Sequence, residues 1–407
     1  MKKQIAYWAL YDFANSIVLI TFLFYFSQWL VIDEGQPAWW YNGSLIASSV
    51  LFIVVAPFVS RRIDRGARKI VGLRFWTAVS LALFAGVAFI ALSTTTLDVL
   101  ATFLFTLATT AYFMCFLYFT PMLNDLSDDS NRGRVSGIGQ GANFLGEVAG
   151  LLCTLPFASG VIALFGGSER AETMLPAVIL AGLFSLPMLF FYRDRVTRAS
   201  EEMKHSPGSS FISSIRATLL YKPLALLLLA YFLFGDALLT FGNNFPLYLE
   251  TLYGTDDTTK ALLTIVILTL SAVGGVVFGF VTDRVGHKKT LIWILGFWVL
   301  LFGAASFVTN FNIIVPLFLI GGLFFGPVWG ITRAMVGRFA PPNLTASSYM
   351  YYVVAERFAT LVGPLAWSGA LLAFGEGAPG YQAAIFSMGI LIVAGLFVMS
   401  KVPETPP

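Results

Sequence analysis

The stretch Gly279-Phe-Val-Thr-Asp-Arg-Val-Gly-His-Lys-Lys289 is a short charged turn that follows a long apolar segment. A related turn, Ile63-Asp-Arg-Gly-Ala-Arg-Lys69, follows another apolar segment in the first half of the chain. Each turn combines an Asp-Arg pair with a glycine and a basic pair. A polar correspondence also precedes each turn, with Tyr11-Asp12 before the first and Gly235-Asp236 before the second. These repeats indicate two halves built on the same plan.

Composition places most of the chain in lipid. Of its 407 residues, 57% are hydrophobic and 12% are charged, and the mean hydropathy is +0.79. Soluble domains carry about 25% charged residues, so this chain has too little polar surface to cover a globule in water. Its apolar runs are long enough to cross roughly 30 Å of hydrocarbon. They are continuous rather than alternating in polarity, which predicts helices instead of a β-barrel.

The predicted fold is an all-α membrane protein with twelve transmembrane helices in two pseudo-symmetric six-helix bundles. The first bundle covers residues 1–192 and the second covers 218–407, with a basic, serine-containing cytoplasmic linker at 193–217. No small-residue cleavage site follows the first apolar stretch, so we expect a retained first helix. The spans are expected near 6–32, 40–60, 72–92, 97–121, 135–164, 174–192, 221–248, 260–282, 290–308, 312–332, 347–374 and 382–400.

Basic residues predict the orientation, since cytoplasmic loops are enriched in lysine and arginine. Only Arg170 and Lys260 fall in connections on one side of the predicted bilayer. The opposite side carries the N-terminal lysines, Lys401 and basic clusters at 61–74, 193–216 and 284–289. Both termini are therefore predicted to be cytoplasmic, in a multi-pass plasma-membrane protein whose expected location is a bacterial inner membrane. The net charge of +3 reflects this bias rather than nucleic-acid binding.

Both charged turns resemble the signature of the major facilitator superfamily, Gly-x-x-x-Asp-Arg-x-Gly-x-Lys/Arg, which follows the second and eighth helices. The second turn matches it in full, whereas the first has Ser60 in the leading glycine position. Within the superfamily the chain is similar to the autophagy-related vacuolar amino-acid effluxer family and its bacterial relatives. The residues that carry this similarity are Trp8-Ala-Leu-Tyr-Asp-Phe-Ala-Asn-Ser16, Asn131-Arg-Gly-Arg-Val-Ser-Gly-Ile-Gly139, Pro57, Asp64-Arg-Gly66, Phe234-Gly-Asp236, Thr240 and Gly363-Pro364.

The chain differs from that family at two places where the family's sequence bears on ligand binding. The family has Gly-Tyr-Leu-Gly-Gly in its fifth span, where this chain has Asn143-Phe-Leu-Gly-Glu147. It has Ser-Arg at the end of its tenth span, where this chain has Thr332-Arg333. The additional carboxylate of Glu147 predicts a ligand or coupling ion that differs from the family's usual one.

Polar residues inside the predicted spans are the candidate binding residues, because a charge at mid-bilayer costs about 2.5–3.5 kcal/mol on insertion scales. Helical spacing places Asp12, Asn15 and Ser16 on one helix face. It places Asn143 and Glu147 on one face of another helix. The predicted set for substrate or proton binding is Asp12, Asn15, Asn143, Glu147, Asp236, Thr240, Asn243, Glu356, Arg357 and Arg333.

Each of these residues also has a structural interpretation. Hydrogen bonds or salt bridges between helices would account for most of them, and Asp12 lies near a cytoplasmic end, where a helix cap or gate fits. Glu147 could pair with Arg357 across the halves and form a gate. Arg333 lies at the end of a span, where an arginine extends toward the interface, with an anion clamp as the alternative.

The two charged turns are predicted to act as conformational latches. Each aspartate can accept hydrogen bonds from helix N-termini and arginine, which would stabilise one closed arrangement of the halves. Two rows of small residues, Ser271-x3-Gly275-x3-Gly279 and Gly322-x3-Gly326-x3-Gly330, predict close helix packing. The predicted latch residues are Asp64, Arg65, Gly66, Gly279, Asp283, Arg284, Gly286 and Lys288.

No enzyme chemistry is predicted. The two histidines, His205 and His287, fall in cytoplasmic loops. The absence of a phosphate-binding Gly-Lys-Ser/Thr run argues against ATP-driven transport, and no cofactor is expected. No cluster has metal-ligand spacing, although Asp12, Glu147 and Asp236 could together suit a hard cation.

The sequence therefore predicts a secondary active transporter that works by alternating access between its two bundles. A carboxylate such as Glu147 or Asp236, desolvated in the closed state, would exchange a proton as access switches. The excess of acids over arginines in the spans favours a cationic or zwitterionic solute, and the family resemblance implies amino acids. The expected partners are this small solute, protons or another coupling ion, and the lipid bilayer, with the chain as a monomer.

Alternatives remain open within and outside the transporter class. A sugar, a peptidoglycan fragment or a divalent metal ion is the alternative cargo. A non-transporting membrane receptor on the same fold predicts that the intramembrane carboxylates can be neutralised without loss of binding. A membrane enzyme acting on lipid would need a nucleophile or metal set at the interface, and the sequence presents neither.

Overall fold

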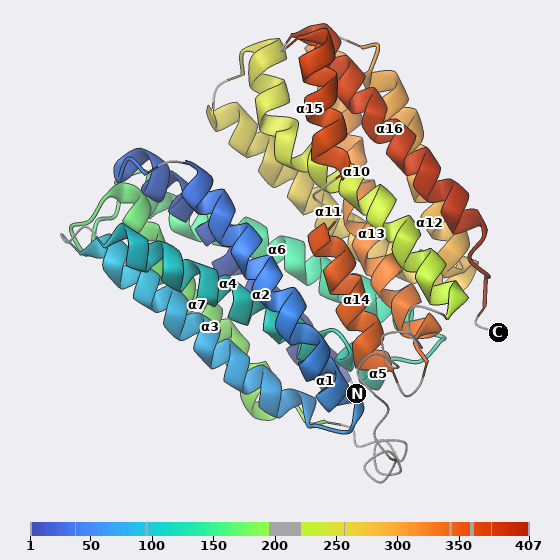
Figure 1. Cartoon of the computed structure of the whole chain (residues 1–407), viewed down its shortest axis with the longest axis horizontal. Helices are drawn as coiled ribbons and strands as arrows, with labels where there is room; N and C mark the ends of the chain where they lie inside the picture. Colours follow the sequence, from blue (N-terminus) through green and yellow to red (C-terminus); the bar gives the residue numbers. More distant parts are fainter. Residues whose placement is uncertain are drawn as a thin grey trace. The chain divides into compact units, whose positions relative to one another are not determined.

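The described parts of the chain consist of helices joined by short turns (Figure 1). Eleven of the described helical segments are long and apolar enough to cross a membrane. The all-α membrane fold expected from composition is therefore confirmed. The structure is a computed structural model that describes residues 2–36, 38–93, 97–194, 221–255, 257–308, 310–341, 344–358, 362–375 and 377–405.

The helices follow the predicted spans with one difference. The first span is one membrane-crossing segment, Lys2–Asp33, in which an α-helix continues into π-helical turns. The predicted eleventh span at 347–374 is instead described as two helices, α14 (Thr345–Phe358) and α15 (Val362–Phe374). Residues 359–361 lie outside the described part, so the count of twelve spans stays a prediction.

The chain divides into two compact units, each described by itself. The division falls inside one helix, α6 (Arg132–Ala158), whose first ten residues belong to the second unit. The predicted bundles and linker stay a prediction, because residues 195–220 lie outside the described part. The first unit comprises Met1–Leu126 and Ala142–Gly208, and the second comprises Ser127–Gly141 and Ser209–Pro407.

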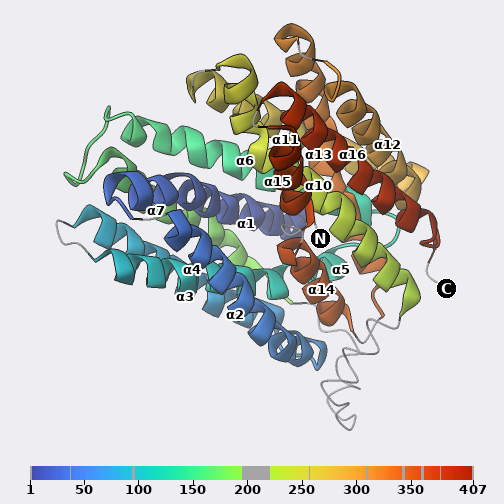
Figure 2. The same ribbon diagram turned by 45° about the horizontal axis from the view of Figure 1, so that its top comes forward.

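The first unit is built from long helices that pack on one another. Helix α1 packs on α7, and α3 packs on both α4 and α7. Figure 2 shows α2, α3 and α4 side by side. Besides the later part of α6, its elements are α1 (Lys2–Thr21), η1 (Phe22–Phe26), η2 (Trp29–Asp33), α2 (Ala38–Asp64), α3 (Lys69–Leu92), α4 (Asp98–Phe119), α5 (Met122–Leu126) and α7 (Glu169–Phe191).

A cluster of phenylalanine rings fills the core of this unit. Phe22, Phe84 and Phe105 are fully buried, and the ring centroids of Phe22 and Phe84 lie 4.5 Å apart. Phe26 stacks on Phe105 at a centroid distance of 4.3 Å. Aromatic pairs at such distances contribute about 0.5–1.5 kcal/mol each beyond the burial of their area. The cluster holds the first membrane-crossing segment against α3 and α4.

In the second unit, the long helices α11 and α13 pack closely against each other. Helix α16 packs against α10, α12 and α15. The elements of this unit, besides the start of α6, are α10 (Lys222–Tyr253), α11 (Asp257–Val285), α12 (His287–Ala305), α13 (Phe311–Phe339), α14, α15 and α16 (Ala378–Ser400).

Small residues allow α11 and α13 to approach closely. The Ser271 hydroxyl donates to the Gly322 carbonyl oxygen at 2.9 Å. A Cβ added at Gly274 would lie 1.8 Å from the Leu323 carbonyl oxygen, and one added at Gly322 would lie 3.0 Å from the Ile267 carbonyl oxygen. The close packing predicted from the rows of small residues is therefore confirmed.

Both charged turns require a glycine with positive φ. Gly66 has φ of +91° and Gly286 has φ of +105°, values that side chains rarely permit. The Gly66 N–H donates to the Ile63 carbonyl, and the Gly286 N–H donates to the Thr282 carbonyl, both at 2.9 Å. These bonds end α2 and α11 and turn the chain into the following helix.

Each charged turn is also tied to the end of a later helix in its own unit. Both oxygens of Asp194, which follows α7, accept from the Ile70 N–H at 3.3 and 3.2 Å. Burial raises the pKa of the Asp194 carboxyl. In the second unit, Lys288 Nζ donates to the carbonyls of Ser400 and Val402 at 2.9 and 2.6 Å, at the end of α16.

Replacing Gly274 with alanine should lower stability by about 1–3 kcal/mol, because the added methyl group would overlap the Leu323 carbonyl. Thermal unfolding of the purified protein measures the effect. Gly296→Ala in α12 is the matched control, since an added Cβ there meets no atom within 4 Å and alanine favours a helix over glycine. Equal Tm values for the two variants would contradict the close contact.

Candidate functional site

Two aromatic side chains anchor α1 within the first unit. Trp8 Nε1 donates to the Phe119 carbonyl at 3.2 Å, and the Trp8 ring stacks on the Phe119 ring with centroids 4.8 Å apart. The Tyr11 hydroxyl bonds to Thr77 Oγ1 at 2.6 Å. Trp8 and Tyr11 are fully buried. These contacts to α3 and α4 fix the rotation of α1 about its axis. They therefore also fix the direction in which Asp12 and Ser16 of the same helix point.

A polar cluster joins α1 to the later part of α6. Asn143 Nδ2 donates two hydrogen bonds, one to Ser16 Oγ at 2.6 Å and one to Asp12 Oδ1 at 3.2 Å. The Ser16 hydroxyl donates to the Asp12 carbonyl oxygen at 3.0 Å. Asp12 is 1% exposed and Ser16 is 2% exposed. The structure thus brings Asn143 to two residues of α1 that lie 131 and 127 positions away in sequence.

Glycines on α6 permit this contact. A Cβ added at Gly146 would lie 2.2 Å from the Phe13 carbonyl oxygen, and one added at Gly150 would lie 3.0 Å from the Ile17 carbonyl oxygen. The backbones of α1 and α6 therefore touch where side chains would otherwise separate them. This close approach lets the short side chain of Asn143 reach Asp12.

Glu147 lies one helical turn beyond Asn143 on the same face of α6. Glu147 is half-buried. Its carboxylate lies close enough to Asp12 for the two acidic groups to repel each other electrostatically. Within the described residues of this unit, its carboxylate makes no hydrogen bond or ion pair. Asn15 is half-buried on α1 and takes no part in the bonds of the cluster. Asp12 is therefore bonded, whereas Glu147 has no bonding partner among the described residues of this unit.

In the second unit, Asp236 bonds to the start of α15. Asp236 is fully buried, and its Oδ2 accepts from the Gly363 N–H at 2.6 Å while its Oδ1 accepts from Thr240 Oγ1 at 3.3 Å. A carboxylate at this position satisfies a backbone N–H that has no partner within its helix and complements the positive helix end. Asp236 and Thr240, both predicted binding residues, are thus brought together in a structural contact.

The other predicted binding residues of α10 and α14 are less buried than Asp236. Asn243 is exposed on α10, and Glu356 is half-buried on α14. The Tyr352 ring stacks on the Tyr231 ring with centroids 4.8 Å apart, which joins α14 to α10. The side chain of Arg357 lies outside the described part, so its predicted pairing with Glu147 stays a prediction.

Arg333 is buried within the second unit, with 5% exposed. Its Nε donates to Ser136 Oγ at 3.1 Å, and an NH2 donor reaches the Ser136 carbonyl at 2.7 Å. The Ser136 hydroxyl in turn donates to the Gly330 carbonyl at 2.6 Å. The predicted extension of Arg333 toward the membrane interface is therefore wrong, because the guanidinium finds its acceptors on the start of α6.

The aspartate of the second charged turn caps α6. Asp283 Oδ1 accepts from the Gly133 N–H at 2.8 Å, and Oδ2 accepts from the Arg134 N–H at 2.9 Å. The Arg134 Nε also lies 3.8 Å from Oδ2, and its guanidinium sits over the Phe280 ring. The predicted bonds from a helix N-terminus and an arginine to this aspartate are confirmed.

The other latch residues support the turns in different ways. A Cβ added at Gly279 would lie 2.8 Å from the Gly133 carbonyl oxygen, so this glycine brings α11 against α6. Arg284 and Arg65 are exposed, and Asp64 is half-buried. The latch role of the first turn, and the movement that either turn controls, stay predictions.

Sequence reasoning missed two kinds of contact. Ser136 was not predicted to bind Arg333, because a serine within a glycine-rich helix gives no signal of its partner. The anchoring of α1 by Trp8 and Tyr11 was also missed, although their spacing of three places them on one helix face. Asp12, Glu147 and Asp236, the three acids that could together suit a hard cation, come from both units. That cation site stays a prediction.

Comparisons with known proteins agree with this architecture. Residues 227–407 match the model of the Major Facilitator Superfamily. The uncharacterized MFS-type transporter YxiO of Bacillus subtilis is 24% identical over 99% of this chain and 95% of its own length. Autophagy-related protein 22 of Pyricularia oryzae is 25% identical over 35% of this chain and 23% of its own length.

Superposition on solved structures identifies the fold. The outward conformation of FucP, a major facilitator superfamily transporter, superposes with a TM-score of 0.77 at 13% identity, over 98% of this chain and 99% of that one. The chain has the major facilitator fold. The proton:xylose symporter XylE gives a TM-score of 0.74 at 15% identity, over 99% and 95% of the two chains. These findings confirm the expected resemblance and support a secondary transporter as the general class.

Two motifs that carry the resemblance now have places in this major facilitator fold. The segment Trp8–Ser16 supplies both the aromatic anchors of α1 and two members of the polar cluster. The segment Asn131–Gly139 supplies the helix start that Asp283 caps and the serine that binds Arg333. Each motif therefore combines a packing role with a polar contact.

Gly363→Ala should destabilise the protein by about 1–3 kcal/mol. The added Cβ would lie 2.3 Å from Thr240 Oγ1 and 2.7 Å from Asp236 Oδ1, so it would displace the cap of α15. Thermal unfolding measures this loss, with Gly369→Ala as the matched control, because an added Cβ at that position of the same helix meets no atom within 4 Å. If both variants melt at the wild-type temperature, Asp236 does not hold α15.

Asp283→Asn should speed hydrogen exchange at the Gly133 and Arg134 amides by about tenfold, because the amide side chain offers one acceptor oxygen instead of two. Exchange mass spectrometry on the start of α6 provides the measurement. Asp129→Asn is the control, since Asp129 is exposed and bonds to the Arg132 side chain rather than to either of these amides. Unchanged exchange in Asp283→Asn would show that the cap is not needed.

Proposed function

We propose that this chain is a secondary active transporter of a small polar solute, either an amino acid or another cationic or zwitterionic metabolite. It works by alternating access and couples transport to protons. The observation that carries the proposal is Glu147, a half-buried carboxylate in a membrane-crossing helix that has no bonding partner among the described residues of its unit.

A carboxylate without a partner is costly inside a membrane, and such residues mark substrate or ion pathways. Glu147 lies near Asp12, which is buried and bonded to Asn143. Two neighbouring carboxylates cannot both carry charge without a cation or a proton between them. The arrangement supports an exchange in which Glu147 is neutralised by a proton in one state and by the solute's cationic group in another.

Asp236 has a different position in this proposal. Both of its oxygens already accept hydrogen bonds, from the Gly363 N–H and from Thr240. Asp236 therefore serves mainly to hold the start of α15 in place. If it also binds the solute or a proton, α15 must rearrange, which would link occupancy to movement of that helix.

The solute class follows from the charges and from the family resemblance. Among the predicted residues, the acids outnumber the arginines, and Arg333 is already bonded to Ser136. A positively charged amino group would complement the remaining acids, and a zwitterion could add its carboxylate to the hydrogen-bond donors nearby. The similarity to autophagy-related protein 22 and to an MFS-type transporter accords with a role in solute transport across a membrane.

Alternating access and location complete the proposal. The latch formed by Asp283 and the start of α6 would stabilise one conformation and open in the other. The distribution of basic residues supports cytoplasmic termini in a bacterial inner membrane, with a monomer as the transporting unit.

Transport into proteoliposomes tests the proposal. A pH-sensitive dye inside the vesicles records proton movement as each of the common amino acids is added in turn. At least one cationic or zwitterionic amino acid should drive proton movement in the wild type. Glu147→Gln should abolish this proton movement and weaken exchange of the labelled solute, since the glutamine keeps the shape but can neither release a proton nor pair with the solute's cationic group.

Glu169→Gln is the matched control, because Glu169 is exposed at the start of α7 in the same unit. It should behave as the wild type in both assays. Proton movement that persists in Glu147→Gln would remove this residue from the coupling mechanism. Failure of every amino acid to move protons in the wild type would overturn the proposed solute or its coupling.

A further inference from the structure

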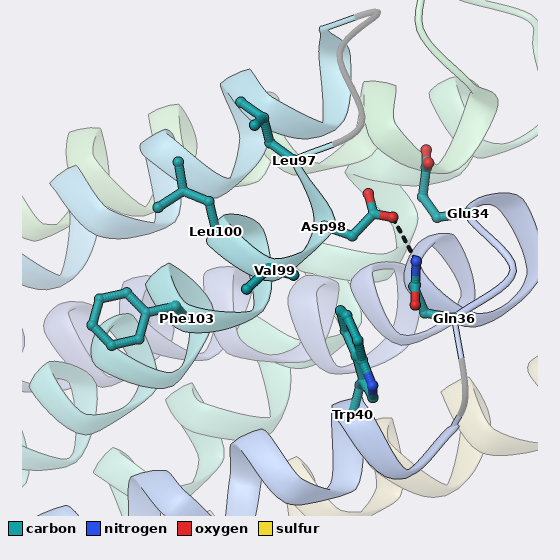
Figure 3. A pocket seen from close by; sticks show the side chains of 8 residues that line it. All are labelled: Glu34, Gln36, Trp40, Leu97, Asp98, Val99, Leu100 and Phe103. Carbon is teal, nitrogen blue, oxygen red and sulfur yellow. Dashed lines mark hydrogen bonds between the residues drawn. The ribbon is translucent and has the colours of Figure 1, made fainter.

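A pocket at one end of the first unit lies apart from the polar cluster of α1 and α6 (Figure 3). It forms where the segment after η2 meets the start of α4, at the opposite end of α4 from Phe119 and the Trp8 anchor. Its volume is about 800 Å³, which falls within the range of roughly 300–1,000 Å³ found for ligand sites.

One side of the pocket is acidic. Asp98, at the start of α4, is 9% exposed, and its Oδ2 accepts from Gln36 Nε2 at 2.7 Å. The amide is neutral, so this bond leaves the negative charge of Asp98 uncompensated. Glu34 lies beside Asp98 in the pocket (Figure 3). Burial, together with the neighbouring carboxylates of Asp98 and Asp33, raises the pKa of Glu34.

No basic side chain among the described residues pairs with these two acids. Arg170, the arginine at this end of the unit, is bonded to Asp33 instead. Glu34 and Asp98 therefore face the pocket as acceptors with a net negative charge. A ligand that brings an ammonium group would supply the missing cation and donate hydrogen bonds to both carboxylates.

The other side of the pocket is apolar and lies on a membrane-crossing helix. Val99 is 70% exposed, Leu100 43% and Phe103 58%, and all three belong to the span Asp98–Leu126. Figure 3 shows Leu100 and Phe103 along α4, on the side away from Glu34. Apolar side chains exposed on a membrane span contact lipid, so the pocket opens toward acyl chains rather than only toward water.

Trp40 completes the lining between these two sides. Tryptophan is enriched at the boundary between hydrocarbon and headgroups, which places the pocket at headgroup depth. A ligand that fits must combine a cationic amine at this depth with an apolar chain that continues along α4. Water-soluble amines lack the second feature.

We propose that this pocket binds a membrane phospholipid whose headgroup carries a primary amine, with the ammonium on Glu34 and Asp98 and an acyl chain along Leu100 and Phe103. A primary ammonium donates hydrogen bonds to carboxylates, which a quaternary ammonium cannot do. The site is separate from the transport cluster, so this lipid is a bound component of the protein rather than its cargo.

Native mass spectrometry of the full chain tests the proposal with lipids of matched acyl chains. Dioleoyl-phosphatidylethanolamine, dioleoyl-phosphatidylcholine and dioleoyl-phosphatidylglycerol are titrated separately, and bound lipid is counted at each concentration. The wild type should bind phosphatidylethanolamine at least about tenfold more tightly than either of the other lipids. The double variant Glu34→Gln, Asp98→Asn should lose this preference.

Controls keep the test decisive. Glu169→Gln, an exposed neutralisation in the same unit, should retain the preference. Glu34→Gln alone should weaken it while leaving the Gln36–Asp98 bond in place, and thermal unfolding checks that each variant is folded. Phe103→Ser should weaken binding of the intact lipid but not of glycerophosphoethanolamine, which has the headgroup without chains.

Four results would overturn the proposal. The first is equal binding of phosphatidylethanolamine and phosphatidylglycerol by the wild type, and the second is an unchanged preference in the double variant. The third is competition by glycerophosphoethanolamine at the same concentration as the intact lipid, which would assign the pocket to a soluble amine. Equal binding of phosphatidylcholine would likewise contradict the requirement for a primary amine.

Discussion

The arrangement of the helices depends on one constraint: the free N–H groups at helix starts need hydrogen-bond acceptors. Each unit meets this need with an aspartate from another helix or from a neighbouring turn. Asp283 accepts from two amides at the start of α6, Asp236 accepts from one at the start of α15, and Asp194 accepts from one at the start of α3. These bonds set where helices begin and how they face their neighbours.

Close backbone contact makes these bonds possible. The carboxylate side chain is short, so it reaches a helix start only where glycine lets the backbones approach. Gly279 brings α11 onto α6 beside the Asp283 cap, and Gly363 leaves space for Asp236 at α15. Gly146 has the same effect for Asn143 and the α1 cluster. At the starts of α6 and α15, small residues and acids therefore act together, since glycine permits the close approach that the aspartate needs.

This design separates structural acids from a functional one. An acid that accepts backbone bonds has a role that a membrane helix bundle needs in any case. Glu147 differs, because it lies inside a membrane-crossing helix and lacks such bonding partners among the described residues of its unit. The same distinction applies at the end of the unit, where Glu34 and Asp98 keep an uncompensated charge beside lipid-facing side chains. Negative charge without a cationic partner among the described residues is what points to a ligand.

The sequence by itself determined the membrane class, the approximate spans and the two charged turns, because apolar length and basic asymmetry act locally along the chain. It also marked Asp236, Asp283 and Glu147 as candidates, since a charge in a span or in a repeated turn is conspicuous. Glu34, Asp98 and Asp194 were not among the predicted residues. Only the tertiary structure decided the partners of these polar residues: Asp236 accepts from the Gly363 N–H, and Arg333 binds Ser136. A hydrogen bond depends on which helices touch and at what rotation, and that information arises from packing between segments far apart in sequence.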